Sequence, residues 1–412
     1  MSKVVQIPDG WKPAKIKDAA QVNPRSNSVD DDSLVTFLPM TAVSESGIIQ
    51  GAEIRKAIDV KKGFTSFETG DVLVAKITPC FENYKGCLCT DLKNDRGYGS
   101  TEFHVLRPKK NITGEYLHIL TRTHHFRGTG ELNMTGTAGQ KRVPTVFLKN
   151  YDFPLPPLPE QKAIAELLFT WDEIIEKTER LIQAKEANLK GQIQRIMGKG
   201  AIEANGWSMV HLGELFSEVT RKVGEKELTP YSISAGIGFV SQREKWGKDI
   251  SGSQHKNYTH LKAGEFSYNK GNSKRYQQGC VYLLKDGEIC VPNVFISFKP
   301  KAKNVVPEFF EHYFIADYHA RELKRYITSG ARSDGLLNLN KKDFFKIMVP
   351  YPSPEEQKAI AEALTASQQE IDLLKQLADK YKTQKRGLMQ KMLTGEWRVK
   401  PDIVKAFEET KS

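Results

Sequence analysis

The sequence has no run of about 18 apolar residues, so it predicts no membrane-spanning helix. Its first ten residues lack an apolar segment behind a basic one, and we therefore expect no secretory signal. Cysteine is scarce: the 412 residues include 5, an odd number, and no two have the Cys-x-x-Cys spacing. A chain of this length does not need disulfides for stability, so we expect reduced thiols and a cytoplasmic protein.

The motifs of common enzymes are also missing. The sequence contains no GxxxxGK[ST] phosphate loop, HExxH pair, GxSxG nucleophile elbow or zinc-spaced Cys/His set. It lacks the Asn/Asp-Pro-Pro-aromatic tetrapeptide with which an amino-methyltransferase holds its target base. His124 and His125 are adjacent, and adjacent side chains on a helix point apart, so we predict no metal site there. These absences argue against a self-contained enzyme.

Positive charge is in modest excess. The formal net charge is +11 and the isoelectric point is about 9.1. Residues 1–158 carry an excess of four positive charges and residues 201–354 an excess of six, so most of the excess lies in two long globular stretches. A basic surface favours a polyanionic partner such as nucleic acid, although many ordinary enzymes have a bias of this size. Charge alone therefore leaves both possibilities open.

An internal repeat organises the chain. The heptapeptide EQKAIAE occurs at 160–166 and again 196 residues later, at 356–362. The chain is therefore a tandem duplication in which each copy has a globular part followed by a common tail. The same offset relates Gly10-Trp11 to Gly206-Trp207, Pro154 to Pro350 and Pro156 to Pro352.

Each EQKAIAE motif lies at the start of a predicted long helix, after Pro159 in the first copy and after the N-cap residue Ser353 in the second. The residues that follow form a heptad seam, which predicts that the two helices pair as an antiparallel coiled coil. The alternative is two unrelated surface helices on separate cores. Gly191 and Gly387 occupy equivalent positions, and they indicate either a close helix crossing or docking point, or a fraying last turn of each helix. The seam runs Ile164, Leu168, Trp171, Ile175, Thr178, Ile182, Lys185, Leu189, Gln192, Ile196 in one helix and Ile360, Leu364, Ser367, Ile371, Leu374, Ala378, Tyr381, Lys385, Leu388, Met392 in the other.

The globular parts have the patterns of mixed α and β structure, without the regular βαβ alternation of a doubly wound sheet. The fold class that we predict is α+β: two tandem related domains of mixed α/β structure, separated by two long helices that form an antiparallel coiled coil. Strands are predicted at 34–40, 71–77, 86–91, 102–106, 266–269, 279–284 and 294–299, and helices at 116–125 and 307–326. The predicted parts are a first domain at 1–158, a central spacer helix at 159–200, a second domain at 201–353, a C-terminal spacer helix at 354–396 and a tail at 397–412.

Each globular part contains two polar loops rich in hydrogen-bond donors: 76–85 and 135–142 in the first copy, and 269–278 and 329–338 in the second. Lysine, arginine, asparagine and glutamine contact base edges and phosphates, whereas the alternative is that these are ordinary solvated loops. The copies differ most in these loops, so two related domains would read two different sequences. The candidate DNA-binding residues are Lys76, Lys85, Gln140, Lys141, Arg142, Lys270, Asn272, Lys274, Arg275, Arg332 and Asn338.

Several segments together resemble the DNA-specificity (S) subunit of type I restriction-modification systems. They are PLPPLPEQKAIAELL and YPSPEEQKAIAEAL, each with the helix that follows, and the ending KRGLMQKMLTGEWRV. The resemblance covers essentially the whole chain. It implies two target recognition domains that each read one half of a bipartite asymmetric DNA site, held apart by the antiparallel helices. Recognition loops vary among family members, so the resemblance assigns no base-contacting residue.

The resemblance also implies partners. Two adenine-N6 methyltransferase (M) subunits would dock on the chain, and restriction-translocase (R) subunits would join that core. S-adenosylmethionine, ATP and magnesium would then belong to the partners, and the chain itself would hold no cofactor and perform no catalysis. The competing interpretation is a two-domain coiled-coil scaffold for protein interactions, without sequence-specific DNA binding. A salt titration separates the two, because DNA affinity falls steeply as counterions compete.

Overall fold

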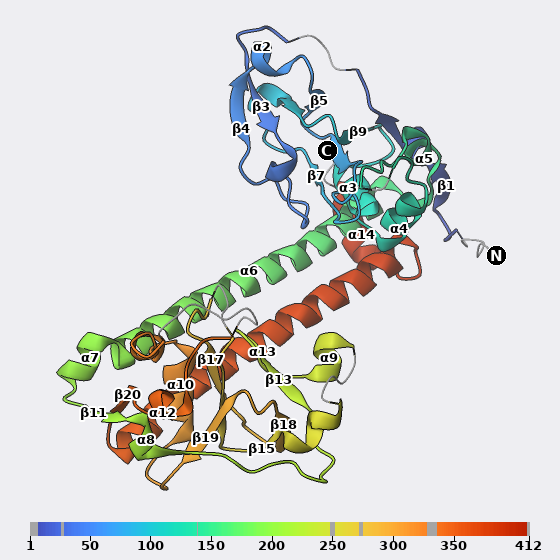
Figure 1. The fold of residues 1–412 in the computed structure, drawn as a ribbon. Coiled ribbons are helices and arrows are strands. Elements are labelled where there is room, and N and C mark those ends of the chain that lie inside the picture. The colour runs from blue at the N-terminus through green and yellow to red at the C-terminus, as the bar shows by residue number, and fades with distance from the viewer. Residues whose placement is uncertain are drawn as a thin grey trace. The chain divides into compact units, whose positions relative to one another are not determined.

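The computed structural model describes residues 7–25, 29–137, 139–247, 252–271, 275–327 and 336–409. The chain divides into two compact units, and the division falls within both long helices. The first unit contains Met1–Lys177 and Ala378–Ser412, and the second contains Thr178–Leu377. Each unit is described by itself below, with the labels of Figure 1.

The first unit is built around a four-stranded antiparallel sheet of order β2-β9-β6-β7. A second sheet, of order β4-β3-β8-β5, contains the parallel pair β3–β8, and β1 pairs with β10. The strands are β1 (Lys12–Lys15), β2 (Ala20–Val22), β3 (Leu34–Leu38), β4 (Glu53–Lys56), β5 (Thr65–Glu68), β6 (Val72–Ala75), β7 (Gly86–Leu88), β8 (Arg96–Gly99), β9 (Phe103–Pro108) and β10 (Asp152–Leu155). The helices of this part are α1 (Ile16–Ala19), α2 (Ala57–Val60), α3 (Gly114–Thr121), α4 (His124–Leu132) and α5 (Thr145–Asn150).

The second unit repeats this architecture. Its antiparallel sheet has the order β12-β19-β16-β17, which matches β2-β9-β6-β7 strand for strand, and β11 pairs with β20 as β1 pairs with β10. In place of the other four-stranded sheet it has two antiparallel strand pairs, β13–β14 and β15–β18. The strands are β11 (Ser208–His211), β12 (Phe216–Glu218), β13 (Tyr231–Ser234), β14 (Gly238–Ser241), β15 (Thr259–Lys262), β16 (Phe266–Asn269), β17 (Cys280–Leu283), β18 (Glu288–Val291), β19 (Ile296–Pro300) and β20 (Met348–Tyr351). The helices are α7 (Lys199–Ala204), α8 (Leu212–Leu215), α9 (Gln242–Trp246), α10 (Pro307–Ile315), α11 (Ala320–Leu323) and α12 (Lys341–Phe344).

The predicted strands are confirmed, but the two predicted helices are each interrupted. In the first copy α3 ends at Thr121, and Thr123 caps a new helix, α4, by accepting a hydrogen bond from the Phe126 amide. In the second copy α10 ends at Ile315, and the backbone turns through Asp317, whose φ of 63° is left-handed. The single helices predicted at 116–125 and 307–326 were therefore wrong, because local capping and a turn outweighed a continuous apolar pattern.

The long helices are α6 (Leu158–Met197) and α13 (Pro354–Leu393), and they pair antiparallel within each unit (Figure 1). In the first unit Lys385 pairs with Asp172, and the Trp171 and Tyr381 rings meet edge to face at 5.8 Å. In the second unit Lys185 pairs with Glu370 at 2.8 Å. All predicted seam positions are buried or half-buried, which confirms the coiled coil.

The equivalent glycines do not mark a close helix crossing. A Cβ atom placed on Gly191 or Gly387 would meet no atom within 4 Å. Both helices continue beyond these positions, to Met197 and Leu393. Of the alternatives left open for these glycines, the close helix crossing is therefore wrong.

The EQKAIAE motif fastens each long helix to its own domain. Gln161 is fully buried; its Oε1 accepts the Thr113 amide at 2.9 Å, and its Nε2 donates to the carbonyl oxygens of Asn111 and Pro156. Gln357 does the same in the second copy, with the Val306 amide and the Pro352 carbonyl as its partners. The preceding glutamate of each motif accepts an indole N–H, Trp11 to Glu160 at 2.9 Å and Trp207 to Glu356 at 3.3 Å. The repeated tryptophans and glutamates of the sequence are thus partners in space.

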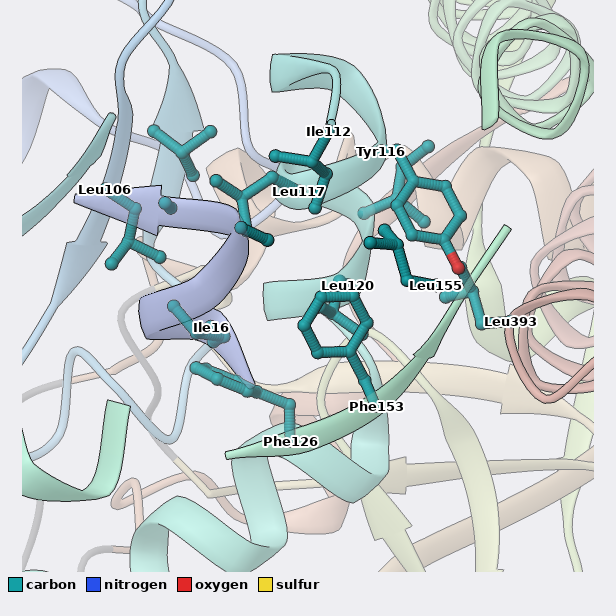
Figure 2. Packing of buried hydrophobic residues seen from close by; sticks show 14 of the residues in the cluster. Ile16, Leu106, Ile112, Tyr116, Leu117, Leu120, Phe126, Phe153, Leu155 and Leu393 are labelled. Carbon is teal, nitrogen blue, oxygen red and sulfur yellow. The ribbon is translucent and has the colours of Figure 1, made fainter. Parts of the chain in front are cut away.

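The C-terminal segment belongs to the first unit. Leu393 and Val399 lie in the same apolar cluster as Ile16 and Leu117, and Figure 2 shows Leu393 among the labelled core side chains. Arg398 donates to both carboxylate oxygens of Glu160, at 2.5 and 2.8 Å. The predicted tail at 397–412 contains a helix, α14 (Pro401–Glu409), which packs Val404 and Phe407 against this cluster.

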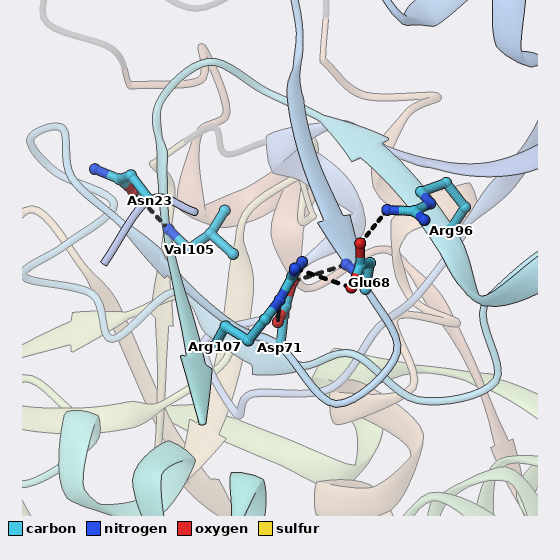
Figure 3. A network of polar contacts seen from close by, with 6 residues as sticks. All are labelled: Asn23, Glu68, Asp71, Arg96, Val105 and Arg107. Atoms are coloured by element: carbon cyan, nitrogen blue, oxygen red, sulfur yellow. Dashed lines mark hydrogen bonds and ion pairs between the residues drawn. The ribbon is translucent and has the colours of Figure 1, made fainter. Parts of the chain in front are cut away.

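A buried ion network joins the two sheets of the first unit (Figure 3). Asp71 is 1% exposed and accepts two hydrogen bonds of 2.8 Å from Arg107 on β9. Arg107 also pairs with Glu68 at 2.9 Å, and Glu68 pairs in turn with Arg96 on β8. Because each buried charge has an opposite charge beside it, the network fixes the turn between β5 and β6.

The core of the second unit is dominated by phenylalanine. Phe216, Phe266, Phe298 and Phe314 are all fully buried. The Phe266 and Phe298 rings stack at 5.1 Å, while Phe216 meets both edge to face. These residues come from β12, β16, β19 and α10, so aromatic packing holds the central sheet to its helix.

Candidate nucleic-acid interface

The two polar loops of the first domain meet at the end of strand β6. Beyond Ala75, the Lys76 carbonyl accepts the Val143 amide at 2.8 Å, and the Thr78 amide donates to the Lys141 carbonyl at 3.0 Å. Isolated bridges also join Ile77 to Arg142. Segments separated by about 60 residues in the sequence therefore form one surface, which sequence reasoning had only grouped by composition.

The second domain brings its loops together in the same way. The Leu337 amide donates to the Lys270 carbonyl at 3.0 Å, and a bridge joins Gly271 to Leu336. Lys270 follows β16 as Lys76 follows β6, so the equivalent strand end carries the polar loops in both copies. The Asn269 side chain shapes this turn by accepting the Gly271 amide and donating to the Ile233 carbonyl.

The predicted contact residues of the first domain differ in their exposure. Gln140 and Lys141 are exposed, whereas Lys76, Lys85 and Arg142 are half-buried. The Lys85 amine donates to the Met40 carbonyl at 3.3 Å, so its charge is tied to the protein. Lys76 and Arg142 both lie beside Glu102.

Arg142 is held by a carboxylate that sequence reasoning missed. Its Nε and Nη2 donate to Glu102 at distances from 2.8 to 3.2 Å, and its Nη1 donates to the Gln140 carbonyl at 3.2 Å. The hydrogen bond from Arg142 lowers the pKa of the Glu102 carboxyl, which therefore stays ionised near neutral pH. An arginine fixed along one edge presents the rest of its guanidinium in a defined direction, which suits bidentate recognition of guanine.

A buried histidine supports the same surface from below. His104 lies on β9, and its Nε2 bonds the Val143 carbonyl at 2.8 Å while its Nδ1 meets the Asn23 amide group at 3.2 Å. Burial lowers the pKa of His104, so the ring is neutral at physiological pH. The base of the 135–142 loop is therefore fixed by hydrogen bonds rather than by charge.

The predicted contact residues of the second domain lie partly outside the described residues. Asn272, Lys274 and Arg332 are among those, so their predicted roles stay predictions. The other three are Lys270, Arg275 and Asn338. Lys270 is half-buried with its amine 3.5 Å from the Leu339 carbonyl, Arg275 is exposed beside the Tyr276 ring, and Asn338 is half-buried.

The chemistry available on these surfaces is that of donors and a few acceptors. Among the residues that the structure describes, no three His, Cys, Asp or Glu side chains are grouped so that they could hold a metal ion. None of the described helices is long and apolar enough to cross a lipid bilayer. The surfaces are suited to bind polyanions through lysine and arginine and to distinguish base edges through paired donors.

The comparison with known proteins identifies a family. The family model for the type I restriction modification DNA specificity domain matches residues 8–186 and again residues 205–382. The chain is similar to the type I restriction enzyme EcoAI specificity subunit of Escherichia coli, with 36% identity over 52% of this chain and 38% of that one. It is also similar to the EcoEI specificity subunit of Escherichia coli, with 33% identity over 70% of this chain and 46% of that one. The chain thus spans less than half the length of either relative.

The fold agrees with this assignment. The crystal structure of a type I restriction-modification system S subunit from M. genitalium is similar over 95% of this chain and 98% of that one, with a TM-score of 0.55 and 15% identity. At that identity the likeness concerns the fold alone. The sequence match covers both copies of the duplication, and the solved structure shares their architecture. The chain therefore belongs to the family of type I restriction-modification DNA specificity subunits.

Proposed function

We propose that this chain is the non-catalytic, sequence-specific DNA-binding subunit of a type I restriction-modification complex. Each domain would read one half of a bipartite asymmetric site. The observation that carries the proposal is that two copies of one scaffold bring their polar loops together at the same strand end. The copies carry different side chains there, Lys76-Ile77-Thr78-Pro79 in one and Lys270-Gly271-Asn272-Ser273 in the other.

The proposed contacts are those inferred from the sequence, refined by geometry. The exposed Gln140, Lys141 and Arg275 side chains would reach base edges or phosphates directly. Arg142 would act with its orientation fixed by Glu102. Base contacts supply sequence discrimination, whereas lysine contacts to phosphate supply affinity that depends on salt.

The proposed partners are double-stranded DNA, two methyltransferase (M) subunits and restriction-translocase (R) subunits, in the cytoplasm. S-adenosylmethionine, ATP and magnesium would be bound by those subunits, which would perform adenine-N6 methylation and cleavage. The long helices also expose single apolar side chains, which a docked subunit would cover. In the second unit Leu373 is 64% exposed on α13, and Leu181 is 45% exposed on α6.

A domain exchange tests the proposal. Residues 1–150 are replaced by the equivalent domain of a relative with a different specificity, and N6-methyladenine in host DNA is mapped by single-molecule sequencing. One half of the methylated motif should change while the other half stays the same. A change in both halves, or in neither, would contradict independent reading by the two domains.

The alternative function is a coiled-coil scaffold that does not recognise DNA sequence. A salt titration of the assembled complex on cognate and scrambled duplexes distinguishes the two. Specific binding should weaken steeply with salt and should prefer the cognate duplex at every salt concentration. Equal affinity for both duplexes at every concentration would favour the scaffold.

A further inference from the structure

Arg127 on helix α4 is a buried cation with an unusual set of partners. Arg127 is only 2% exposed, and each of its side-chain hydrogen bonds goes to a backbone carbonyl. Nε donates to Thr121 at 2.7 Å, Nη1 to Phe81 at 2.9 Å and Nη2 to Lys85 at 3.5 Å. Desolvation lowers the pKa of this guanidinium to about 9.

Burying a charge in this way is costly, so its contacts must offset the loss of water. The guanidinium carbon lies 4.6 Å from the centre of the Phe81 ring and 5.6 Å from that of Tyr84. Two of the three carbonyls and both rings belong to the 76–85 loop, one of the two polar loops at the candidate interface. Most contacts of the Arg127 guanidinium named here are therefore made with that loop.

Arg122, in the turn between α3 and α4, holds the same loop from a second direction. Its Nη1 donates to the Tyr84 carbonyl at 3.0 Å, and its Nη2 donates to the Glu45 carbonyl at 2.8 Å. Tyr84 has a φ of 61°, a left-handed conformation that is unfavourable for a residue with a side chain. An external hydrogen bond to its carbonyl helps to keep the backbone in that conformation.

The second domain fixes its corresponding loop differently. In its described part, tyrosine hydroxyls take this role: Tyr268 donates to the Gln278 carbonyl at 2.7 Å, and Tyr276 donates to the Ile315 carbonyl at 3.4 Å. Arg321, on the helix α11 that follows α10, is exposed. The arginine pair at the α3–α4 corner is therefore a feature of the first domain.

We propose that Arg127, assisted by Arg122, is a positioning residue for DNA specificity in the first domain. The two guanidinium groups fix the carbonyls of Phe81, Tyr84 and Lys85, and so fix the loop whose other end carries Lys76 at the interface. This inference rests on the proposed function and adds to it the residues that preorganise one half-site reader. Loosening the loop should reduce discrimination between base pairs in that half-site and leave the other half-site unaffected.

The experiment uses the full chain assembled with its methyltransferase subunits. The variants are Arg127→Lys, which keeps the charge but loses the three-way fork, Arg127→Met, and the control Arg321→Met. Affinity for duplexes with single mismatches in each half-site is measured by competition, well below the melting temperature of each complex. The domain exchange described above identifies which half-site belongs to the first domain.

Both Arg127 variants should lose roughly tenfold discrimination in the first domain's half-site, with less than about a twofold change in the other half, on the scale of one lost base-specific contact. The control should match the wild type in both halves. Unchanged discrimination in a folded Arg127 variant, or equal loss in both halves, would overturn the proposal. If neither Arg127 variant folds, Arg122→Lys decides by the same criteria. A wild-type complex without any half-site preference would instead refute the proposed function.

Discussion

Replacing Gln161 with leucine tests whether the EQKAIAE motif fastens the long helix to the first domain. The glutamine side chain is fully buried and makes three hydrogen bonds to backbone groups, of 2.9, 2.9 and 2.8 Å. Leucine has a similar volume but no polar atoms. The substitution therefore leaves the Thr113 amide and the carbonyls of Asn111 and Pro156 without this partner.

The expected cost follows from the number of orphaned groups. An unsatisfied buried donor or acceptor costs about 1–3 kcal/mol, so three at the lower end give roughly 3 kcal/mol. For a unit of this size that corresponds to a fall in melting temperature of roughly 6–12 °C. Gln357→Leu orphans only the Val306 amide and the Pro352 carbonyl, so its cost should be nearer 2 kcal/mol.

Two measurements check this prediction. Chemical denaturation gives the free energy of unfolding. Hydrogen exchange with mass spectrometry reports on the Thr113 amide, which should exchange at least roughly tenfold faster in the variant, because about 1.4 kcal/mol corresponds to a factor of ten. The control is Gln369→Leu at an exposed position of α13, which should change stability by less than about 0.5 kcal/mol. A Gln161→Leu protein as stable as the control, with protected Thr113 exchange, would show that the motif does not fasten the helix.

Three further predictions concern other contacts. Burial lowers the pKa of His118 to about 3, so below about pH 6.5 the unfolded chain binds the proton before the folded chain does, and the free energy of unfolding should fall by up to roughly 1.4 kcal/mol per pH unit. Chemical denaturation at pH 7 and pH 5 should show a smaller loss of stability for His118→Gln than for the wild type, and an equal loss would contradict this assignment. If Arg142 reads a base pair as proposed, Glu102→Gln should relax discrimination at that base pair by roughly 5- to 150-fold in mismatch competition, whereas an unchanged ratio would remove Arg142 from the proposed DNA-binding surface. A double-mutant cycle of Trp171→Ala and Tyr381→Ala should give a coupling of about 0.5–1.5 kcal/mol, and no coupling would mean that the ring contact adds nothing beyond buried area.

The elements with a strong repeating pattern were predictable from the sequence. The heptad seam predicted the pairing of α6 and α13, because its positions form one continuous, mostly apolar stripe along each helix. The duplicated motif predicted two related domains, and the sheets β2-β9-β6-β7 and β12-β19-β16-β17 confirm that relation. The motif did not reveal why glutamine follows glutamate, because two of the three partners of Gln161 lie about 50 residues away in the sequence.

Positions fixed by local capping against a continuous apolar pattern, or by long-range contacts, could not be predicted. The turn at Arg122 and Thr123 divides what the apolar pattern presents as one helix, because a side-chain cap competes with helix continuation. Glu102 looked like an ordinary residue at a strand start, and only its 2.8 Å contact with Arg142 gives it a role. Arg127 stands in a polar stretch of sequence, and its burial depends on loop carbonyls 42 and 46 residues away.

The residues repeated in the two copies and the residues that differ between them have different roles. Identical residues in the two copies, such as Gln161 and Gln357, bind backbone groups inside their own domain and would be the same whatever sequence is read. The loops after β6 and β16 share a backbone hydrogen bond at the strand end, to the Lys76 or the Lys270 carbonyl, but they differ in their side chains and in the groups that anchor the rest of each loop. The two copies retain the same scaffold contacts, but their exposed hydrogen-bond donors differ. Such a duplicated chain is suited to an asymmetric target. Exchanging only the exposed loop side chains that do not anchor the loops, such as Lys141 and Arg275, should therefore alter specificity with little effect on stability, since the hydrogen bond at the strand end is common to both copies.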